Sequence, residues 1–556
     1  MGRWQRGLAL LLCAVLACAT LSGCQLPQRG ATDEGSTNAE VSASVEKTSE
    51  PREMPTVALM PLDSRPCNTQ YPQLLAQAAE ATLVMPDSED MDSFLQSADQ
   101  DALWRWLEEQ SQTADDLVIF TNSLFSGGLI ASRSADGYDT VDEDLDHLRQ
   151  ICNEFRQHSD GTITIVQVLP RLQPNQFDST LAPYGKALKA YGQSWDEADA
   201  AGQEAPSTAD GVPDEILAVY KSLHERSANL AQELNLIAAE GLIDQLVISQ
   251  DDGDTLCPAN IAFRALKKAL SDNTTLTHGA DELSMLLVSG LLAQDEKPTQ
   301  VHVVYSSDSS RTDIYPYESV SLQEMIKQKL ALGGLEEADA DADYTLYVHA
   351  KTDDLRTTTN FIAAFNSYLG IADVAMTNQQ DPALEEWLLN SEYFDNVDAY
   401  AGWNTAGNSI GTVCSVMRIS NLLDNHFDEL TKEQKETAAR NIFAFRAVRY
   451  AEDSCYMANI RQPLQDELLQ NQLMKSTSAF VDNDAWAQGN QLLAEAYAPY
   501  NTKLADVFNG DHTLYLGEHQ LDCSISNFAS SMQFPWARAF EVYANVSMDV
   551  TVDEDE

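Results

Sequence analysis

The sequence has few basic residues for its length. Its 556 residues include 34 Lys and Arg against 86 Asp and Glu, which gives a formal net charge of −52. Proteins that bind nucleic acid neutralise phosphates with Lys and Arg, so this composition disfavours a nucleic-acid partner. Hydrophobic residues make up 44% of the chain and charged residues 22%, which is globular composition and excludes a wholly disordered or fibrous protein.

Several catalytic and cofactor motifs are missing. The sequence has no Cys-x-x-Cys, no H-E-x-x-H and no P-loop lysine motif. These absences disfavour a zinc ribbon, a thioredoxin-like protein and a zinc protease, and no nucleotide cofactor is expected. A divalent metal held by carboxylates is an alternative that the sequence leaves open. The cysteines beyond residue 24 are widely scattered, so we expect mostly single buried thiols, with one or two disulfides as the alternative.

Residues 1–23 have the pattern of a secretory signal peptide. Arg3 and Arg6 form a basic start, residues 8–21 are apolar, and small residues precede Cys24. A cysteine directly after Leu-Ser-Gly resembles the bacterial lipoprotein signal, in which that cysteine is diacylated. We therefore expect lipidation at Cys24 and a cell-membrane location on the extracytoplasmic face, because two acyl chains anchor a protein stably. The alternative is an ordinary signal peptide that happens to contain a cysteine.

Composition divides the rest of the chain. Residues 24–54 are rich in Gln, Ser, Thr, Glu and Ala and are typical of a flexible tether. No later stretch is apolar enough to span a bilayer, so the lipid anchor is the only expected membrane contact. The acidic end, Asp549 to Glu556, is expected to fray. The expected body has an α/β lobe at 55–300 with a helical insertion near 184–240, a second α/β unit at 301–418, and a helical region with a mixed tail at 419–556.

Short apolar runs alternate with helical patterns along the body. The runs are mostly continuous, which favours parallel strands buried on both faces. The alternation predicts an α/β fold with mostly parallel, Rossmann-like sheets in two lobes and a helical C-terminal region. The expected helices include Asp99–Gln110, Asp142–His158, Ile261–Leu270 and Glu282–Leu292. The expected strands are Val57–Leu62, Leu117–Phe120, Thr162–Leu169, Gln245–Ser249, Val301–Tyr305, Tyr344–Val348, Asp373–Met376 and Ala399–Ala401.

Polar clusters follow most of these strands. Ligands of open α/β sheets bind beyond the carboxyl ends of the strands, so these clusters are the candidate site. Six motifs lie in order between about Pro55 and Val542: Pro61-Leu62-Asp63-Ser64-Arg65-Pro66, Gly127-Gly128-Leu129 with Ser132-Arg133, Gln250-Asp251-Asp252, Gly279-Ala280-Asp281-Glu282, Gly402-Trp403-Asn404-Thr405-Ala406-Gly407-Asn408, and Pro535-Trp536-x-Arg538-x-Phe540-Glu541.

In this set of motifs the sequence resembles the bacterial family of unknown function DUF4127. One departure is Asn122, which stands where an Asp is expected in that family. If that Asp has a chemical role, this member lacks it. The resemblance implies no particular chemistry, so the function has to be inferred from the residues themselves.

Paired acids at strand ends favour a hydrolase. One carboxyl group with a raised pKa can donate a proton while another stays ionised as base or nucleophile. The predicted catalytic residues are Asp63, Asp252, Asp281 and Glu282, whose carboxyl groups we expect to converge within about 10 Å. Guanidinium groups, an indole face and amides would hold the substrate. The predicted substrate-binding residues are Arg65, Asn122, Arg133, Arg171, Asp251, Trp403, Asn404 and Asn408.

Most of these residues also have a structural interpretation. Asp63 and Arg65 would form an ion pair at the first turn, and Asp281 with Glu282 would stabilise a helix start. Gly127-Gly128 either brings backbone N–H groups to an anion or allows close packing, with Arg133 bound to an internal carboxylate. Trp403 would be a core residue.

The sequence favours an extracytoplasmic lipoprotein with hydrolase activity on the glycosidic bonds of surface or environmental glycans. A glycan or another small polar ligand is the expected partner. The alternative is a non-catalytic lipoprotein that binds a sugar or another small polar ligand. A purely structural envelope protein is disfavoured, because polar clusters at six strand or helix ends indicate a ligand site.

Overall fold

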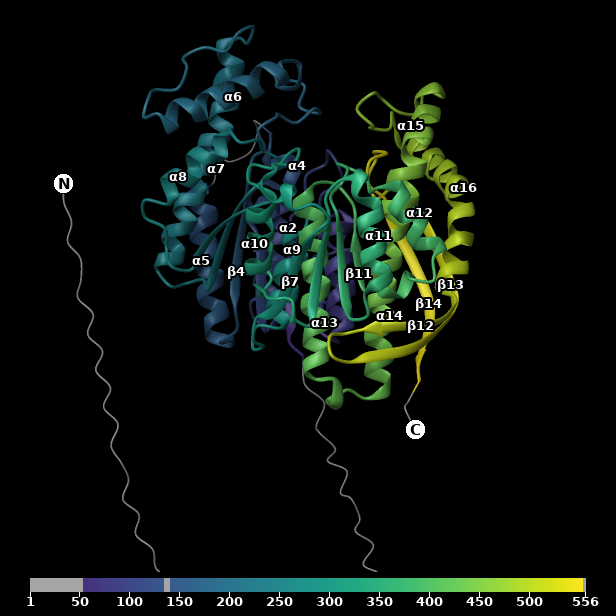
Figure 1. Ribbon diagram of the computed structural model, residues 1–556. Coiled ribbons are helices and arrows are strands. Elements are labelled where there is room, and N and C mark those ends of the chain that lie inside the picture. The colour runs from purple at the N-terminus through teal and green to yellow at the C-terminus, as the bar shows by residue number, and fades with distance from the viewer. Residues whose placement is uncertain (1–53, 135–140, 554–556) are drawn as a thin grey trace, which may run out of the picture. The chain divides into compact units, whose positions relative to one another are not determined.

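Within the residues that the computed structural model describes, 54–134 and 141–553, the first sheet has six parallel strands (Figure 1). Their order across the sheet is β2-β1-β3-β4-β5-β6. The strands are β1 (Thr56–Met60), β2 (Thr82–Val84), β3 (Asp116–Phe120), β4 (Ile163–Leu169), β5 (Gln245–Gln250) and β6 (Thr274–His278). β3 and β4 are buried at every position, as expected for parallel strands covered on both faces.

Helices cover both faces of this sheet. One buried apolar cluster joins alternate residues of the strands, such as Leu117 and Ile119 of β3, to α2 (Gln100–Gln110), α5 (Val141–His158), α7 (Asp214–Ala239) and α8 (Pro258–Leu266). Val118 and Phe120 point to the other face, because successive residues of a strand alternate in direction. There they join a second cluster with α1 (Gln70–Ala78) and α9 (Leu283–Leu292).

Two short helices follow β3: α3 (Thr121–Ser126) and α4 (Leu129–Ser132). Gly127 and Gly128 join them with φ values of 78° and 119°. A Cβ on Gly127 would lie 2.9 Å from the Cβ of Ser97, and one on Gly128 would lie 2.7 Å from the Asp92 carboxylate. The two glycines thus allow close packing and a left-handed turn, the second of the two interpretations of this motif.

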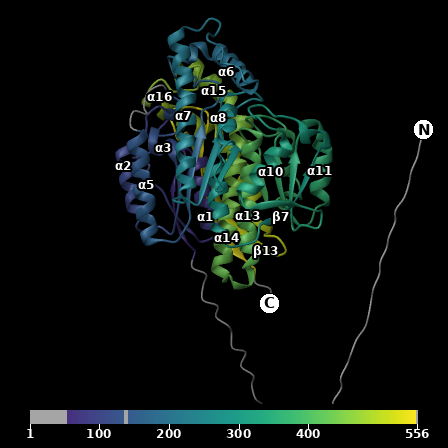
Figure 2. The same ribbon diagram turned by 90° about the vertical axis from the view of Figure 1, so that its left-hand side faces the viewer.

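The segment between β4 and β5 is helical. It contains α6 (Gly185–Ala200) and the long α7, and Figure 2 shows α6 beyond the ends of the strands. Asp196 of α6 ties this layer to the start of α8, because its carboxylate accepts hydrogen bonds from the backbone N–H of Cys257 (2.9 Å) and the amide of Asn260 (2.7 Å). The helical layer therefore lies over the carboxyl ends of β4 and β5.

The second sheet repeats the strand order of the first. Within the described residues it has five parallel strands in the order β11-β10-β9-β7-β8, so each sheet places its second strand at an edge, beside its first strand. The strands are β7 (Thr299–Tyr305), β8 (Leu335–Ala338), β9 (Tyr344–His349), β10 (Tyr368–Asp373) and β11 (Ala399–Ala401). The helices are α10 (Leu322–Leu332), α11 (Leu355–Ala364), α12 (Pro382–Asn390) and α13 (Ala406–Asn425).

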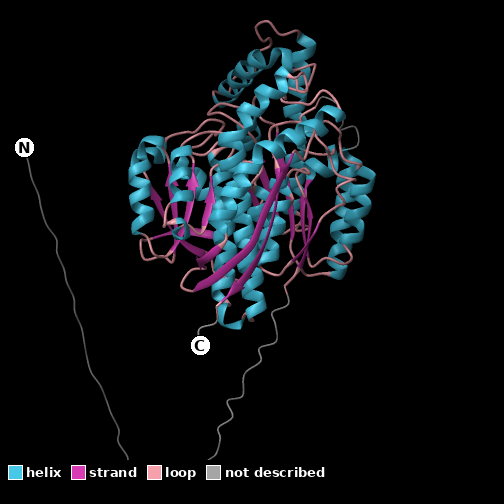
Figure 3. Ribbon diagram, turned by 90° about the vertical axis from the view of Figure 1, so that its right-hand side faces the viewer, coloured by secondary structure: helices cyan, strands magenta, loops and turns pink. Residues whose placement is uncertain are grey.

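The C-terminal region begins with helices and ends in an antiparallel sheet. The helices are α14 (Lys432–Arg449), a π-helix (Tyr450–Ile460), α15 (Arg461–Gln470) and α16 (Asn483–Phe508). The sheet has the order β12-β13-β14, and its two long strands cross the helices in Figure 3. The strands are β12 (Gly510–Tyr515), β13 (Gln520–Gln533) and β14 (Tyr543–Val552). Six 3₁₀ turns complete the described segments: Pro66–Asn68, Ala182–Tyr184, Asp308–Thr312, Thr352–Asp354, Phe394–Asn396 and Phe427–Glu429.

One buried apolar cluster runs through both parallel sheets and the C-terminal region. It joins β1 of the first sheet, α9, α13, the strands of the second sheet, α16 and β14. Burial of a large aliphatic side chain contributes about 1.5–3 kcal/mol. A core shared in this way holds the two sheets in a fixed relation, so side chains from both can form one site.

The predicted α/β fold, with mostly parallel sheets and a helical C-terminal region, is confirmed. Three details were wrong. The strand expected at Asp373–Met376 is β10, at Tyr368–Asp373, and the helix expected at Ile261–Leu270 ends at Leu266. The acidic end does not fray from Asp549, because β14 continues to Val552 and pairs with β13.

The described cysteines are all buried and free: Cys67, Cys152, Cys257, Cys414, Cys455 and Cys523.

Candidate functional site

A polar cavity of about 330 Å³ lies at the carboxyl ends of the parallel strands. Both sheets contribute to it. The first sheet supplies residues that follow β1, β4, β5 and β6, and the second supplies residues that follow β10 and β11. The lining includes eight of the twelve residues that the sequence predicted for catalysis or substrate binding: Arg65, Arg133, Arg171, Asp251, Asp252, Asp281, Asn404 and Asn408.

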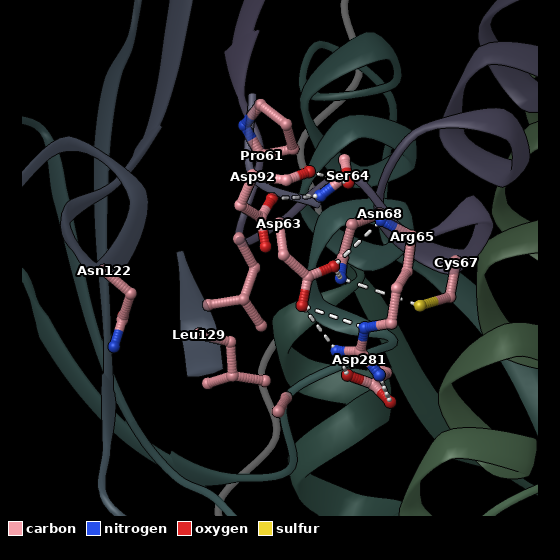
Figure 4. A network of polar contacts seen from close by, with 12 residues as sticks. Pro61, Asp63, Ser64, Arg65, Cys67, Asn68, Asp92, Asn122, Leu129 and Asp281 are labelled. Atoms are coloured by element: carbon pink, nitrogen blue, oxygen red, sulfur yellow. Dashed lines mark hydrogen bonds and ion pairs between the residues drawn. The ribbon is translucent and has the colours of Figure 1, made fainter. Parts of the chain in front are cut away.

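Arg65 is the centre of a buried ion-pair network (Figure 4). Its Nη2 lies 2.7 Å from Oδ2 of Asp63 and 2.6 Å from Oδ1 of Asp281. Its Nη1 donates to the other oxygen of Asp281 (3.1 Å) and its Nε donates to Asp63 (2.9 Å). Burial alone would lower the pKa of Arg65, but the charges of Asp281 and Asp63 outweigh it and raise the pKa well above its usual value.

Asp281 faces the cavity from this network. It also accepts a hydrogen bond from the amide of Asn404 (3.0 Å), a residue of the loop after β11 with a φ of 56°. Burial raises the pKa of Asp281, and the charge of Arg65 opposes that rise. A bidentate contact with a guanidinium, together with an amide donor, is the environment of an ionised carboxylate.

Asp251 and Asp252 follow β5 directly, and both line the cavity because the strand ends at Gln250. Asp251 forms a salt bridge with Arg133, so Arg133 is bound to an internal carboxylate as the structural interpretation predicted. Asp252 is more open, with 31% of its side chain exposed, and its Oδ2 lies 3.4 Å from Nη1 of Arg171. The backbone carbonyl of Asp252 accepts a hydrogen bond from the N–H of Leu172 (3.0 Å), which holds the two loops together.

The acidity of Asp252 is strongly perturbed. Partial burial by the surrounding protein raises the pKa of Asp252 to about 7, and the charge of Asp251 adds to the rise. Arg171 and Arg133 oppose it, while Asp281 raises it further. Asp252 therefore holds a proton over most of the range below neutral pH, whereas Asp281 is paired with a cation.

A match to a protein-family model decides the classification. Residues 57–545 match the family described as "Protein of unknown function (DUF4127)". The chain belongs to the DUF4127 family. The match covers nearly the whole chain, so the resemblance read from the six motifs is confirmed. No curated protein matches the chain.

Four predicted site residues of the DUF4127 protein do not line the main cavity. Asp63 is fully buried behind Arg65, where its carboxylate also accepts a hydrogen bond from Asn68 (2.8 Å), so it positions Arg65. Glu282 is fully buried in an ion pair with Lys329 (2.5 Å). Trp403 is a core residue, as its structural interpretation predicted: it is 6% exposed and its indole N–H donates to Thr412 (3.3 Å).

Asn122 is the fourth, and it lies apart from the Arg65 network in Figure 4. Its side-chain oxygen accepts from the backbone N–H of Val168 (2.9 Å), and its amide nitrogen donates to the carbonyl of the same residue (2.9 Å). It also donates to the hydroxyl of Ser132 (3.2 Å). Asn122 therefore joins α3 to β4, and it is not among the residues that line the cavity.

A substitution at Asn122 tests this structural role. Asn122→Asp replaces the amide donor by a carboxylate oxygen that faces the carbonyl of Val168. We expect the free energy of unfolding to fall by about 1–3 kcal/mol, because a buried carbonyl loses its donor. Urea denaturation measures the loss, and ligand binding per folded molecule should be unchanged. A variant with native stability but altered binding would instead return Asn122 to the site.

Several lining residues of the DUF4127 protein were not predicted. Gln173, Asn175 and Phe177 lie just beyond Arg171 in the loop after β4. The prediction covered this loop only as far as Arg171. Other lining residues belong to segments that follow no parallel strand directly, and nothing in the local sequence marks them: Tyr317, Glu318, Ser319, Thr477 and Ser478. Trp536 and Arg538, which belong to the last of the six motifs, also line the cavity.

Aromatic side chains and buried amide oxygens complete the cavity. The indole N–H of Trp536 donates to the hydroxyl of Ser64 (2.8 Å), and the ring lies 5.6 Å from the guanidinium of Arg65. Gln250 and Asn408 are 2% and 4% exposed, and the side-chain oxygen of each has no hydrogen-bond partner among the described residues. Buried acceptors of this kind can take hydrogen bonds from water or from a ligand that carries donors.

Across 54–134 and 141–553, no group of three or more His, Cys, Asp or Glu side chains is placed to hold a metal ion. In the same part of the chain, no helix is long and apolar enough to cross a membrane. The predicted lipidation site, Cys24, and the predicted signal peptide and tether up to residue 53 lie outside the described residues.

Proposed function

We propose that this DUF4127 protein hydrolyses glycosidic bonds, with Asp252 as the proton donor and Asp281 as the ionised carboxylate. The observation that carries the proposal is that two carboxyl groups of different character line one cavity. Burial raises the pKa of Asp252 to about 7, whereas Asp281 is held by Arg65 and Asn404. A pair of acids with separated roles is the equipment of a glycoside hydrolase.

The cavity lining supports a polyhydroxylated substrate. Side-chain amides with both a donor and an acceptor fit sugar hydroxyl groups, and aromatic rings pack against the apolar faces of sugar rings. The volume of about 330 Å³ is at the lower end of the range for small-ligand sites. The amides are Gln173, Asn175, Gln176, Gln250, Asn378, Asn404 and Asn408, and the aromatic residues are Phe177, Tyr317, Trp536 and Phe540.

A non-catalytic binding protein is the second candidate. The observation that favours it is that all three aspartates of the cavity contact an arginine: Asp251 with Arg133, Asp281 with Arg65, and Asp252 with Arg171. A cavity whose charges are already paired can hold a ligand without performing chemistry. In such a protein the loss of one carboxylate would weaken binding moderately and there would be no turnover to lose.

A hydrolysis screen separates the two candidates. Purified protein is incubated with bacterial surface glycans, plant polysaccharides and chromogenic glycosides, and the release of reducing ends is measured for the wild type and for Asp252→Asn. Release by the wild type and its loss in the variant support the hydrolase. Binding of a glycan by both proteins, with no release by either, supports the binding protein.

We further propose that the protein is anchored at the extracytoplasmic face of the cell membrane by lipid on Cys24. The proposal rests on the basic start, the apolar run and the Leu-Ser-Gly-Cys sequence at residues 21–24. Two acyl chains supply enough buried CH₂ groups for stable attachment. A glycan-degrading enzyme in that position would meet substrates outside the cell.

The anchor is tested by Cys24→Ala. We expect the variant to leave the membrane fraction or to accumulate unprocessed, because the thiol that accepts the lipid is gone. Fractionation followed by immunoblotting measures the distribution, and Cys18→Ala, a change within the apolar run, is the matched control. If the Cys24→Ala protein remained in the membrane fraction with the mobility of the wild type, the lipoprotein assignment would be lost.

A further inference from the structure

Four arginines line the cavity of a chain whose net charge is −52: Arg65, Arg133, Arg171 and Arg538. Two of them have their charged nitrogens occupied by the protein itself. Arg65 binds Asp63 and Asp281 through Nε, Nη1 and Nη2. Arg538 binds both carboxylate oxygens of Glu541 through Nε, and its Nη2 donates to the same group (2.5 Å). Neither has much capacity left for a ligand.

Arg171 is different. It is the most exposed of the four, with 27% of its side chain accessible against 10–12% for the others. Its Nε donates to the carbonyl of Gln173 (3.0 Å), which fixes the direction of the side chain. Its contact with an acid is a single 3.4 Å approach of Nη1 to Asp252, much looser than the bidentate pair of Arg65 with Asp281. The guanidinium is thus oriented by the protein and weakly satisfied.

Arg133 lies close to Arg171 and also has an unused donor. Its Nη2 is bound to Asp251, but its buried Nε has no hydrogen-bond partner among the described residues. The positive charge of Arg171 is one of the causes that lower the pKa of Arg133, after burial, so the two guanidiniums repel each other. Two like charges with free N–H groups at the same wall form a site for an anionic group.

We propose that the substrate of this cavity is an acidic sugar, whose carboxylate or sulfate group binds between Arg171 and Arg133. The acidic group would replace Asp252 as the partner of Arg171 and would supply the acceptor that Arg133 Nε lacks. Gln250 and Asn408, whose buried side-chain oxygens have no partner in the described part of the chain, would accept hydrogen bonds from hydroxyl groups of the same sugar. The inference rests on the proposed function for the position of the substrate, but it is tested by binding alone.

The charges around this wall couple binding to a proton. Arg133 and Arg171 face Asp251 and Asp252, so the four groups sum to zero when all are ionised. The other charged groups of the lining are Arg65 with Asp281, Arg538, and Glu318, whose pKa burial raises. An added anionic group leaves the four groups one negative charge in excess, and a proton on Asp252 restores the balance. Affinity for an acidic sugar should therefore fall as the pH rises through about 7, where Asp252 loses its proton.

The test is isothermal titration calorimetry with sugars that contain no glycosidic bond, so that hydrolysis cannot contribute. Glucuronate and galacturonate are compared with glucose 6-sulfate, and glucose and galactose are the neutral counterparts. We expect the acidic sugars to bind roughly 10-fold or more tightly than the neutral ones at pH 6, and this preference to shrink at pH 8.5. The carboxylate and sulfate arms identify which acidic group is preferred.

Arg171→Gln should remove the preference for acidic sugars and leave the weak binding of neutral sugars in place. Arg149→Gln is the matched control, since Arg149 lies on α5 and contacts Asp146 and Glu240, away from the cavity lining. Equal affinity for acidic and neutral sugars, or a preference that survives in Arg171→Gln, would overturn the inference. Hydrolysis of neutral glycans without binding of acidic sugars would overturn it while leaving the proposed function intact.

Discussion

Asp252→Asn should reduce turnover of the glycan substrate by roughly 100-fold or more, because general acid catalysis contributes at least that factor. The substitution keeps the size of the side chain and removes the proton that the leaving group needs. The variant should still fold, because Asp252 is 31% exposed and its contact with Arg171 is 3.4 Å long. Steady-state kinetics on the best substrate of the screen measures the change.

Asp254→Asn is the matched control for this substitution. Asp254 lies on the same loop but outside the cavity lining, and its carboxylate contacts Lys189 (3.4 Å) and the backbone N–H of Thr255 (2.8 Å). We expect it to keep wild-type turnover. Equal turnover of wild type and Asp252→Asn would show that Asp252 is not the proton donor.

The pH dependence of stability gives an independent check on Asp252. Its pKa is about 7 in the folded protein, against an ordinary value near 4 in the unfolded chain. Between these values the folded state binds more protons, so the free energy of unfolding falls as the pH rises from about 4 to about 7 and levels off above that. Asp252→Asn removes this contribution. The melting temperature of Asp252→Asn, measured relative to that of the wild type, should therefore be higher at pH 8 than at pH 4.5.

Arg65→Leu should lower the free energy of unfolding by about 3–5 kcal/mol, the cost of leaving a buried charge without its partner. Arg65 is the shared cation of two carboxylates, Asp63 and Asp281, whose side chains are 0% and 7% exposed. Without the guanidinium, both acids must take up protons or remain as uncompensated buried charges. The loss should be smaller at pH 4 than at pH 8, since protonation of the two acids relieves part of it.

The control for Arg65→Leu is Arg149→Leu. Arg149 forms only long contacts of 3.4 and 3.5 Å with acids whose side chains are 82% and 50% exposed. Exposed ion pairs of this kind contribute up to about 1 kcal/mol. Guanidinium chloride denaturation of both variants compares the two environments directly. A loss at Arg65 no greater than that at Arg149 would contradict the central position that the ion-pair network gives to Arg65.

The sequence predicted the central strands well and missed three edge strands. β2, β6 and β8 lie at edges of the two parallel sheets. Their sequences are short or polar, TLV, TTLTH and LEEA, because an edge strand is partly open to solvent and does not need a continuous apolar run. The central strands are buried on both faces, and their continuous apolar sequences reflect that burial.

The placement of β10 failed for a different reason. Gly370 interrupts its apolar run and weakens the strand signal. A Cβ at that position would lie 2.5 Å from the side chains of Val413 and Met417 on α13, so the close approach of the helix to the sheet requires glycine. This contact joins residues more than forty positions apart, and no local pattern could reveal it.

The position of the candidate site could be predicted because parallel strands end at the same edge of a sheet. Which acid faces the cavity could not. Asp63 and Asp281 both follow strands and are alike in sequence context, yet Arg65 covers the first and leaves the second at the cavity wall. Asp281 and Glu282 are adjacent, yet Glu282 points to Lys329. The contacts that separate them, with Arg65 and with Lys329 of α10, form only in the folded protein.

The hydrogen bond from Trp536 to Ser64 joins residues 472 positions apart. Because the ribosome makes the chain from its N-terminus, Ser64 and Arg65 emerge long before the residues that complete their surroundings. A nascent chain can form the first sheet, but its cavity stays open on one side until the segment before β14 arrives. Closing so long a loop is entropically costly and slow. The cavity is therefore completed late, and an incomplete chain carries the acids without the enclosure that surrounds them in the full-length protein.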